Sequence, residues 1–534
     1  MSRPNLGAGD ILPLVRRLSG APDPLALHAV LTDGGRRPDT LLFESADAAT
    51  GQGEKSVLLP RTMLRLEGRG HAVRVIPLTA NGAALRDWLA GILGEDAAVR
   101  RDGETLVADY PPPAADDRDE QARLRAPGPL DALRAVTLRP NLVSAPAPLA
   151  HLAAGIFAYD LVDRFERLPA ANADRLGFPD FVFWVPEQVL VLDHVHRSTT
   201  VITPVVGGDN AEASYHDAVR AIELLARAVQ DGPTGRRAGG RTPPPAGPSP
   251  RPPVQVDLDD DGYAALVRDL KRHIVAGDVF QIVPSRTFTL PCPDPFAAYR
   301  RLRDANPSPY MFFVRGPEAV LLGASPETAV KVGATPRTVT LRPIAGTAPR
   351  GRHPDGRIDH ELDARLQAAL LTDAKELAEH MMLVDLARND VARVSRPGTR
   401  RVRELLTVDR YQHVMHLVSE VEGELAPGND ALHAYAATLN MGTLVGAPKI
   451  RAAELLRERE ADKRGPYGGA VGYLTHDGEM DTAIVIRSAL VQDGVAHVRA
   501  GAGIVLDSDP AAEAAETSRK AAAVLEAITP GEAS

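Results

Sequence analysis

The sequence predicts an α+β fold in which β-sheets are covered by helices. Segments with the alternation and β-branched content of strands occur between amphipathic helical segments along all 534 residues, and no internal repeat separates them. The hydrophobic share of 44% and the charged share of 25% are ordinary for a globular protein. A chain of this length exceeds one small core, so we expect two or more cooperating domains.

The clearest domain boundary lies at residues 231–255. Seven prolines occupy the eleven positions from Pro243 to Pro253, and a run rich in arginine and glycine precedes them. Such a segment builds neither sheet nor helix and is typical of a linker. We therefore predict an N-terminal domain at 1–230, a linker at 231–255 and a C-terminal domain at 256–530.

The N-terminal part mixes strands and helices. Thr40–Ser45, Ala72–Ile76 and Phe181–Asp193 have the composition of strands, whereas Tyr215–Val229 has helical spacing of its apolar residues. The segment from Pro111 to Arg123 is rich in aspartate and proline and is expected to be a loop.

The C-terminal part opens with a predicted helix, Gly262–Ala276, and a predicted strand, Val279–Leu290. Two further strands are expected on either side of the turn Arg315-Gly316-Pro317. A long helix is predicted from Asp359 to Val391.

The end of the chain predicts three strands and a helix. Ala470–Leu474, Thr482–Gln492 and Val495–Val505 are strand-like and are joined by turns that contain glycine. The alanine-rich segment Pro510–Ile528 follows as the last helix.

Composition excludes several classes of protein. With 61 basic and 70 acidic residues the formal charge is −9, which gives no electrostatic footprint for nucleic acid. The only cysteine, Cys292, excludes an internal disulfide and any site built from several cysteines, and its flanking prolines favour a structural role. The segment Met1–Gly7 lacks the apolar run of a signal peptide, and no apolar stretch would span a bilayer. We expect a soluble cytoplasmic protein with no membrane partner.

Acidic residues on two predicted helices are candidate metal ligands. Glu379 has Leu383 and Leu386 four and seven residues later, which puts its carboxylate on the apolar stripe of the helix. Glu513 and Glu516 lie on the last helix, and two carboxylates from separate helices suit Mg²⁺. An ion pair with an arginine is an equal alternative for Glu379, and a solvated face is the alternative for the last helix.

Two glycine-dense runs and three polar residues are candidates for binding and acid/base work. Tyr467–Gly472 and Ala500–Gly503 would let the backbone approach a ligand closely, although the pattern alone favours tight sheet packing. Arg487 would clamp a carboxylate from mid-strand, Glu327 ends a strand in a turn, and His416 lies in an apolar run typical of a core histidine. These local patterns predict an anion-binding metal site and no particular reaction.

A series of short sequence blocks resembles those of a known enzyme family. The blocks are Phe280–Arg286, Asn306–Met311, Gly323–Glu327, Pro343–Thr347, Lys375–Asp390, Met415–Leu417, Gly446–Lys449, Gly465–Gly472, Asp481–Ala483 and Ala500–Val505, with weaker matches at Leu41–Ser45 and Gly155–Asp160. In this order they resemble the chorismate-utilising enzymes, and most closely the anthranilate synthase large subunits. The resemblance implies two β-sheets flanked by helices, with an interwoven N-terminal regulatory domain.

The resemblance also assigns roles. Glu379 and Glu516 would hold Mg²⁺, which grips the ring carboxylate of chorismate. Glu327 would be the general acid that protonates the leaving ring hydroxyl as ammonia adds, and His416 would serve the loss of pyruvate. The residues expected to bind the substrate are Gly346, Thr347, Tyr467, Arg487, Gly501, Ala502 and Gly503.

Two positions discriminate among members of the family. Members of the family that add water look to have a lysine, which acts as a base, where this chain has Gln281. Members that use a lysine as the nucleophile have that lysine where this chain has Ala345. Both routes are closed here, which leaves free ammonia as the nucleophile. Cys292 lacks the setting of a glutaminase nucleophile, so ammonia from glutamine would need a separate glutaminase subunit, in a heterotetramer of two large and two small subunits.

The N-terminal motif implies control by tryptophan. By the family's pattern the inhibitor would contact Ser45, Lys55, Pro309, Tyr310 and Met311 and would favour an inactive arrangement. The alternative is that Leu41–Ser45 is merely an edge strand.

Two positions depart from the family's pattern, and two other functions stay open. Val445 stands where serine is usual, and Ala348 stands where arginine is usual. These changes would affect the rate and the product more than the class of reaction. Separately, one open alternative is an enzyme that stops at 2-amino-2-deoxyisochorismate in a specialised pathway, and the other is a non-catalytic tryptophan-binding subunit. The presence of Glu327, Glu379, His416 and Glu516 favours the complete reaction to anthranilate.

Overall fold

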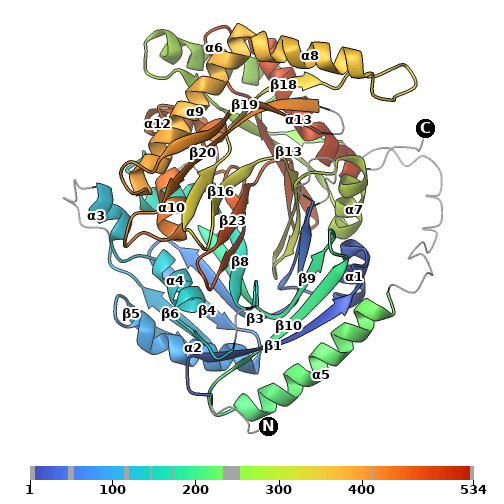
Figure 1. Ribbon diagram of the computed structural model, residues 1–534. Helices are drawn as coiled ribbons and strands as arrows, with labels where there is room; N and C mark the ends of the chain where they lie inside the picture. The colour runs from blue at the N-terminus through green and yellow to red at the C-terminus, as the bar shows by residue number, and fades with distance from the viewer. Residues whose placement is uncertain are drawn as a thin grey trace.

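The computed structural model describes residues 6–45, 53–112, 120–144, 147–170, 173–232, 253–411 and 414–529. It confirms the α+β class, with helices packed on an extensive antiparallel sheet (Figure 1). Most of the predicted linker at 231–255 falls on residues 233–252, which lie outside the described residues. The predicted domain limits therefore stay a prediction.

The N-terminal strands form the centre from which the whole sheet extends. The long strand β9 (Phe181–Asp193) pairs antiparallel with β3 (Lys55–Arg69), with β10 (Ser198–Val206) and with β8 (Leu152–Phe157). β10 in turn pairs with β1 (Asp10–Ser19). These strands lie in the lower half of Figure 1.

A first arm of the sheet leaves through an N-terminal strand. β2 (Thr40–Glu44) pairs with β3 on one side and with β14 (Tyr310–Arg315) on the other. From β14 the pairing continues through β15 (Ala319–Ser325), β24 (Ser488–Gln492), β25 (Val495–Gly501), β13 (Ser285–Pro291) and β11 (Gln255–Val256).

A second arm leaves through β8, which pairs with β22 (Ala470–Thr475). The pairing continues through β23 (Met480–Ile484), β16 (Thr328–Val332), β17 (Thr338–Leu341) and β20 (Val414–Glu424), which also pairs with β18 (Ile344–Pro349) and β19 (Arg401–Arg410). Each arm thus begins on an N-terminal strand and ends in C-terminal strands, which is the interweaving that the family resemblance implies.

Helices cover both arms. α13 (Pro510–Ile528) packs on β25 and against α6 (Asp260–Val275) and α7 (Pro295–Ala305), while α9 (Ala374–Val394) packs on β18 and β20. α13 begins where the Asp509 side chain accepts the Ala512 N–H and Pro510 takes the first helical position. Among the described residues, no helix is long and apolar enough to cross a bilayer.

The other elements belong to the sheet, to its covering helices and to the connections between them. They are α1 (Pro24–Leu31), β4 (Ala72–Pro77), α2 (Ala80–Leu93), β5 (Ala98–Asp102), β6 (Thr105–Asp109), α3 (Glu120–Arg125), α4 (Leu130–Leu138), β7 (Asn141–Leu142), η1 (Tyr159–Arg164), α5 (Ala211–Gln230), β12 (Gln281–Ile282), α8 (His360–Thr372), α10 (Ala431–Thr438), α11 (Gly442–Val445), β21 (Gly446–Ala447) and α12 (Lys449–Arg459).

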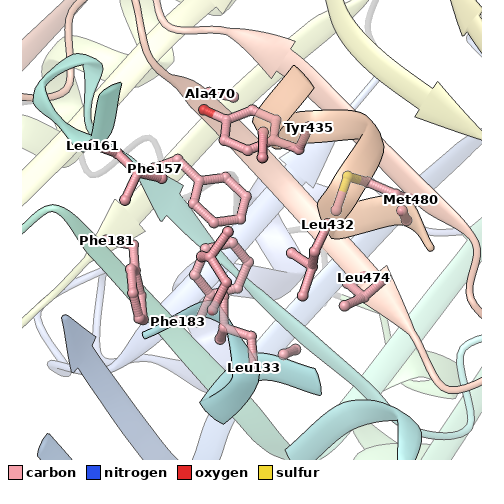
Figure 2. Close-up of a cluster of buried hydrophobic side chains, with 14 of the residues drawn as sticks. Leu133, Phe157, Leu161, Phe181, Phe183, Leu432, Tyr435, Ala470, Leu474 and Met480 are labelled. Carbon is pink, nitrogen blue, oxygen red and sulfur yellow. The ribbon is translucent and has the colours of Figure 1, made fainter. Parts of the chain in front are cut away.

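An aromatic cluster joins the N-terminal and C-terminal parts (Figure 2). The ring of Phe157 on β8 stacks on Tyr435 of α10 with centroids 4.2 Å apart, and it lies 4.5 Å from the ring of Phe183 on β9. All three side chains are almost fully buried. Because aromatic pairs bury large apolar areas, the two parts share one core rather than folding side by side.

Three predicted elements are interrupted in the structure. The helix predicted at Asp359–Val391 is two helices, α8 and α9, because Asp373 adopts an extended conformation and its carboxylate accepts the N–H groups of Lys375 and Glu376. The strand predicted at Val279–Leu290 divides into β12 and β13 at Pro284, which has no N–H for the ladder.

Arg487 does not lie mid-strand. The segment predicted as one strand, Thr482–Gln492, divides into β23 and β24, and Arg487 stands between them with φ of 50°. The predicted loop from Pro111 to Arg123 also runs into a short helix, α3, while residues 113–119 lie outside the described residues. Phe181–Asp193 and Pro510–Ile528 are confirmed with the predicted limits.

Candidate active site

Glu327 is a buried carboxyl group at the junction of β15 and β16. Its exposed fraction is 8%, and the Thr443 hydroxyl donates to its Oε1 at 3.1 Å. Burial raises the pKa of Glu327 to about 8, although the Thr443 hydroxyl and the charge of Lys520 act in the opposite direction. The group is therefore largely protonated at neutral pH, as a general acid requires.

His416 lies on β20 beside the glycine-containing strand β18. Its Nδ1 is 2.9 Å from the Thr347 hydroxyl, its register partner, and its ring lies 5.4 Å from that of Tyr411. Burial lowers the pKa of His416, and the charge of Arg487 lowers it further, whereas a backbone hydrogen bond at Gly346 raises it. The imidazole is therefore neutral near pH 7 and able to accept a proton.

The side chains of Arg487 and Lys520 are both anchored near the end of β25. Arg487 Nη1 donates to the backbone carbonyl of Lys520 at 2.7 Å. Lys520 Nζ donates to the Gly501 carbonyl at 3.1 Å and lies 2.7 Å from Glu516 Oε1. A guanidinium and an ammonium group thus lie next to the glycine-rich segment, where they suit an anionic ligand.

Glycine is required in the segment Gly501–Gly503 because other groups approach it closely. A Cβ on Gly501 would lie 2.6 Å from the Pro284 carbonyl oxygen and 3.1 Å from the Tyr467 hydroxyl. A Cβ on Gly503 would lie 2.6 Å from the side-chain nitrogen of Gln281. The N–H of Ala502 donates to the Tyr263 hydroxyl at 3.3 Å, which anchors the segment from behind.

Glutamates of α9 and α13 lie close enough to influence one another. Burial raises the pKa of Glu379 and of Glu513, and the carboxylate of Glu516 raises both further. Lysines partly offset this repulsion, because Lys375 lies 3.7 Å from Glu379 and Lys520 lies 2.7 Å from Glu516. Both helices lie in the upper half of Figure 1.

This arrangement fits a cation that takes few protein ligands. In the described part of the chain, no group of three or more His, Cys, Asp or Glu side chains could hold a metal ion. Mg²⁺ keeps several waters and is commonly bound through one or two carboxylates together with an anionic substrate. The mutual repulsion of Glu379 and Glu516 is the feature that such a cation would relieve.

The predicted tryptophan contacts surround a second cavity, of about 460 Å³. Ser45, Lys55, Pro309, Tyr310 and Met311 all line it. The pairing of β14 with β2 brings Ser45 to the last three of these residues, and the pairing of β2 with β3 adds Lys55. The charged groups of the cavity include Glu54, Lys331, Arg342, Glu420, Glu479 and Asp481.

Sequence reasoning missed three residues of the site. Lys520 lies one turn after Glu516 on α13, and this i, i+4 spacing of opposite charges was the available signal. Glu376, whose carboxylate oxygen would lie 3.2 Å from a Cβ on Gly346, joins the acidic group that includes Glu513, which the sequence had already placed among the candidate ligands. Thr443 gave no local signal, because it reaches Glu327 from 116 residues away.

The two departures from the family's pattern occupy apolar surroundings. Val445 is buried in a cluster with Tyr159 and Ile282, and Ala348 is buried against Met415 and Leu417. Neither place needs a polar side chain. Burial raises the pKa of Cys292 to about 11, so this thiol is not an activated nucleophile.

Comparisons with known proteins agree with the geometry. The family of chorismate binding enzymes matches residues 103–526. The anthranilate synthase component 1 of Vibrio cholerae is 48% identical over 507 residues, which are 95% of this chain and 94% of the relative. The chain belongs to the chorismate binding enzyme family.

Other members of this family extend the comparison. The pyocyanine-specific anthranilate synthase component 1 of Pseudomonas aeruginosa is 49% identical over 92% of this chain and 90% of its own. The crystal structure of anthranilate synthase component I from Streptococcus pneumoniae aligns with a TM-score of 0.67 and 30% identity, covering 88% of this chain and 92% of that one. The menaquinone-specific isochorismate synthase of Escherichia coli has the same fold, with a TM-score of 0.63, 18% identity and coverage of 99% and 97%.

Proposed function

We propose that this chain is the large subunit of an anthranilate synthase, which aminates chorismate with ammonia and eliminates pyruvate to give anthranilate. The observation that carries the proposal is the protonated, buried carboxyl of Glu327 in the same site as the cations Arg487 and Lys520. The names of the full-length relatives at 46–49% identity support the same activity.

Binding of chorismate requires partners for two carboxylates. Arg487 and Lys520 supply positive charge beside the glycine-lined floor, and Tyr467 lies at its edge. Because both cations are anchored to protein groups, they need little reorganisation when the dianion arrives. Thr347 is exposed next to His416 and would add a hydroxyl donor.

The amination step needs an acid for the leaving group. Ammonia forms the C–N bond to the ring, the C–O bond to the ring hydroxyl breaks, and the Glu327 proton leaves with the hydroxyl as water. The ammonium product then returns a proton to the solvent. General acid help of this type is typically worth ~10²–10⁴-fold in rate.

The elimination step needs a base. The neutral imidazole of His416 accepts the ring proton whose loss makes the ring aromatic, as the bond between the ring carbon and the enolpyruvyl oxygen breaks. The enolpyruvate that leaves takes up a proton at its methylene carbon and becomes pyruvate. The hydrogen bonds with the Thr347 hydroxyl and with the backbone at Gly346 hold the ring of His416 in place.

Mg²⁺ is part of the proposal, with Glu379 and Glu516 as its protein ligands. When bound, the cation neutralises the ring carboxylate and orients the ring. Without it, Lys375 and Lys520 are the groups that balance the two glutamates. Removal of Mg²⁺ with EDTA should abolish turnover and excess Mg²⁺ should restore it; an unchanged rate in EDTA would refute the metal site.

The nature of the nucleophile follows from two uncharged residues. Gln281 is buried and its amide lies against Gly503, and Ala345 adjoins Gly346 on β18, so neither position offers an ionisable base or nucleophile. Free ammonia, which is present at high pH, attacks without being deprotonated first, whereas water needs a base to remove its proton. We therefore propose ammonia, delivered by a separate glutaminase subunit in a heterotetramer.

The glutaminase requirement has a direct test. The purified chain should turn over with ammonium salts and not with glutamine, and glutamine should become active when a glutaminase subunit is added. Glutamine-dependent turnover by the chain alone would refute the need for a partner.

Regulation by tryptophan is proposed for the 460 Å³ cavity. The inhibitor's ammonium and carboxylate groups would meet acidic and basic side chains of the cavity, and its indole would lie against Pro309 and Met311. Inhibition requires that tryptophan bind the inactive arrangement more tightly than the active one. Full activity at millimolar tryptophan would refute this role.

The decisive experiment follows anthranilate fluorescence after chorismate, ammonium and Mg²⁺ are added together. Release of about one pyruvate for each chorismate consumed is expected. Chorismate consumption without pyruvate would instead identify a 2-amino-2-deoxyisochorismate synthase, and no consumption would identify a non-catalytic subunit.

A further inference from the structure

Thr328 stands between the candidate regulatory cavity and the candidate catalytic acid. It lines the 460 Å³ cavity together with Tyr310, and it also lines the small cavity that contains the Glu327 side chain and Thr443. Arg342 likewise lines both cavities. The two sites are therefore separated by single side chains.

Hydrogen bonds tie Thr328 to the wall of the regulatory cavity. The Tyr310 hydroxyl lies 3.0 Å from the Thr328 hydroxyl and donates to Asp481 Oδ1 at 3.1 Å. A phenol hydroxyl can donate one hydrogen bond, and that of Tyr310 goes to the Asp481 carboxylate. The Thr328 hydroxyl is therefore the donor to the Tyr310 oxygen. Lys331 lies 3.7 Å from the other oxygen of Asp481 and orients it.

Thr328 also begins a β-bulge directly after Glu327. Thr328 pairs with Ala483 and Val330 with Thr482, so Ala329 is the extra residue of β16. Bulges re-aim the side chains that precede and follow them. The Glu327 carbonyl accepts the Ile484 N–H at 3.0 Å, and the Thr482 hydroxyl donates to the Val330 carbonyl at 2.8 Å, so the backbone is held on both sides of Thr328.

A second link runs along the register of β14 and β15. Tyr310 is the register partner of Ser325, and the Ser325 hydroxyl lies 3.3 Å from the N–H of Glu327. Displacement of Tyr310 by a ligand would therefore disturb both ends of the Ser325–Thr328 turn that carries the acid.

We infer that Thr328, held by the Tyr310 hydroxyl, is a positioning residue for Glu327, and that a ligand in the regulatory cavity inhibits by breaking this hydrogen bond. The inference rests on the proposed roles of Glu327 and of the tryptophan cavity. The new element is the residue that couples the two sites: a ligand in the tryptophan cavity would act on Glu327 through Thr328. Such coupling is possible because a β-bulge has discrete conformations, and a ligand can shift the balance between them.

Thr328→Val removes the hydroxyl and keeps the shape of the side chain. We expect kcat with ammonia to fall about tenfold, as for loss of one positioning hydrogen bond, with KM for chorismate within about twofold. The alkaline limb of the kcat profile should move, because the carboxyl of Glu327 is no longer held in one environment. Thr328→Ser should restore the wild-type values, which a purely packing role of the methyl group would not allow.

The coupling is measured separately from binding. Calorimetric titration should show that Thr328→Val binds tryptophan within about threefold of wild type, while maximal inhibition falls severalfold. Tyr310→Phe removes this bond and also the bond to Asp481, so it should lose at least as much kcat as Thr328→Val, and the double variant should be no worse than Tyr310→Phe alone.

A matched control is Thr203→Val on β10. The Thr203 hydroxyl donates to the Ala218 carbonyl at 3.2 Å, far from both cavities, so kcat and inhibition should stay unchanged. If Thr328→Val keeps wild-type kcat, pH profile and inhibition, or if Thr328→Ser fails to restore them, the inference is wrong. A wild-type enzyme that tryptophan does not inhibit would instead refute the regulatory role, and an inactive wild-type enzyme the proposed function.

Discussion

Two buried glutamates, Glu327 and Glu460, have similar exposure and opposite ionisation. Glu327 is 8% exposed and Glu460 is 9% exposed. Burial raises the pKa of Glu327 to about 8, since the Thr443 hydroxyl and the charge of Lys520 offset it only in part. Burial would also raise the pKa of Glu460, but Arg464 and Arg499 outweigh it and lower the value to about 2.

The difference shows that partners, rather than burial, decide what a buried carboxyl does. Glu460 accepts hydrogen bonds from both arginines and from Ser285, which fix the ends of α12, β13 and β25. Glu327 lacks such partners and keeps its proton. The carboxylate of Glu460 therefore links three elements of the fold, whereas the carboxyl of Glu327 has the raised pKa that the proposed general acid needs.

The largest expected effect is the loss of that proton. Glu327→Gln keeps the size and hydrogen bonding of the side chain but cannot protonate a leaving group. We expect kcat for anthranilate formation to fall by ~10²–10⁴-fold, while chorismate still binds. Stopped-flow fluorescence and equilibrium dialysis with chorismate measure the two quantities. A variant with more than a tenth of wild-type kcat would exclude Glu327 as the acid.

The corresponding substitution at the other buried glutamate is Glu460→Gln. It leaves Arg464 and Arg499 buried beside a neutral amide, and breaking a buried pair typically costs about 3–5 kcal/mol. We expect a large fall in the midpoint of thermal or urea unfolding at pH 7. If the midpoint stays within the error of the wild type, the buried ion cluster does not stabilise the fold.

The pH dependences of the two glutamates should have opposite signs. The raised pKa of Glu327 means that its contribution to stability is present below its unfolded pKa of about 4.5 and is lost as the pH rises through about 8. The lowered pKa of Glu460 means that its contribution is present above about 4.5 and is lost as the pH falls through about 2.

Unfolding midpoints across pH test this contrast. Glu327→Gln should be more stable than wild type at pH 9 and equal to it at pH 4, whereas Glu460→Gln should be less stable than wild type at pH 7. The kcat of the wild type should also fall as the pH rises through about 8. A rate that keeps rising above pH 9, after correction for free ammonia, would contradict a protonated Glu327.

The smallest effect is expected at Thr443. Its hydroxyl lowers the pKa of Glu327, so Thr443→Val should move the alkaline limb of the rate profile to higher pH by a fraction of a unit. The rate at pH 7 should change by no more than about threefold, as for one hydrogen bond. A shift to lower pH would mean that the hydroxyl stabilises the protonated form instead.

Short contiguous motifs allowed much of the candidate site to be predicted. Glu327, His416, Arg487 and the Gly501–Gly503 segment each lie in a block with its own pattern, and the structure brings these blocks together at the ends of β15, β20 and β25. The limits of Phe181–Asp193 and Pro510–Ile528 were also predicted correctly, because alternation and caps are local signals.

The sequence by itself determined the residue types, the family and the order of the elements. Only the tertiary structure decided that the pKa of Glu460 is lowered and that of Glu327 raised, that Thr443 and Lys520 are neighbours of Glu327, and that Arg487 interrupts a strand. The physical reason is that a pKa depends on burial and on charges brought from distant parts of the chain, which no local pattern contains.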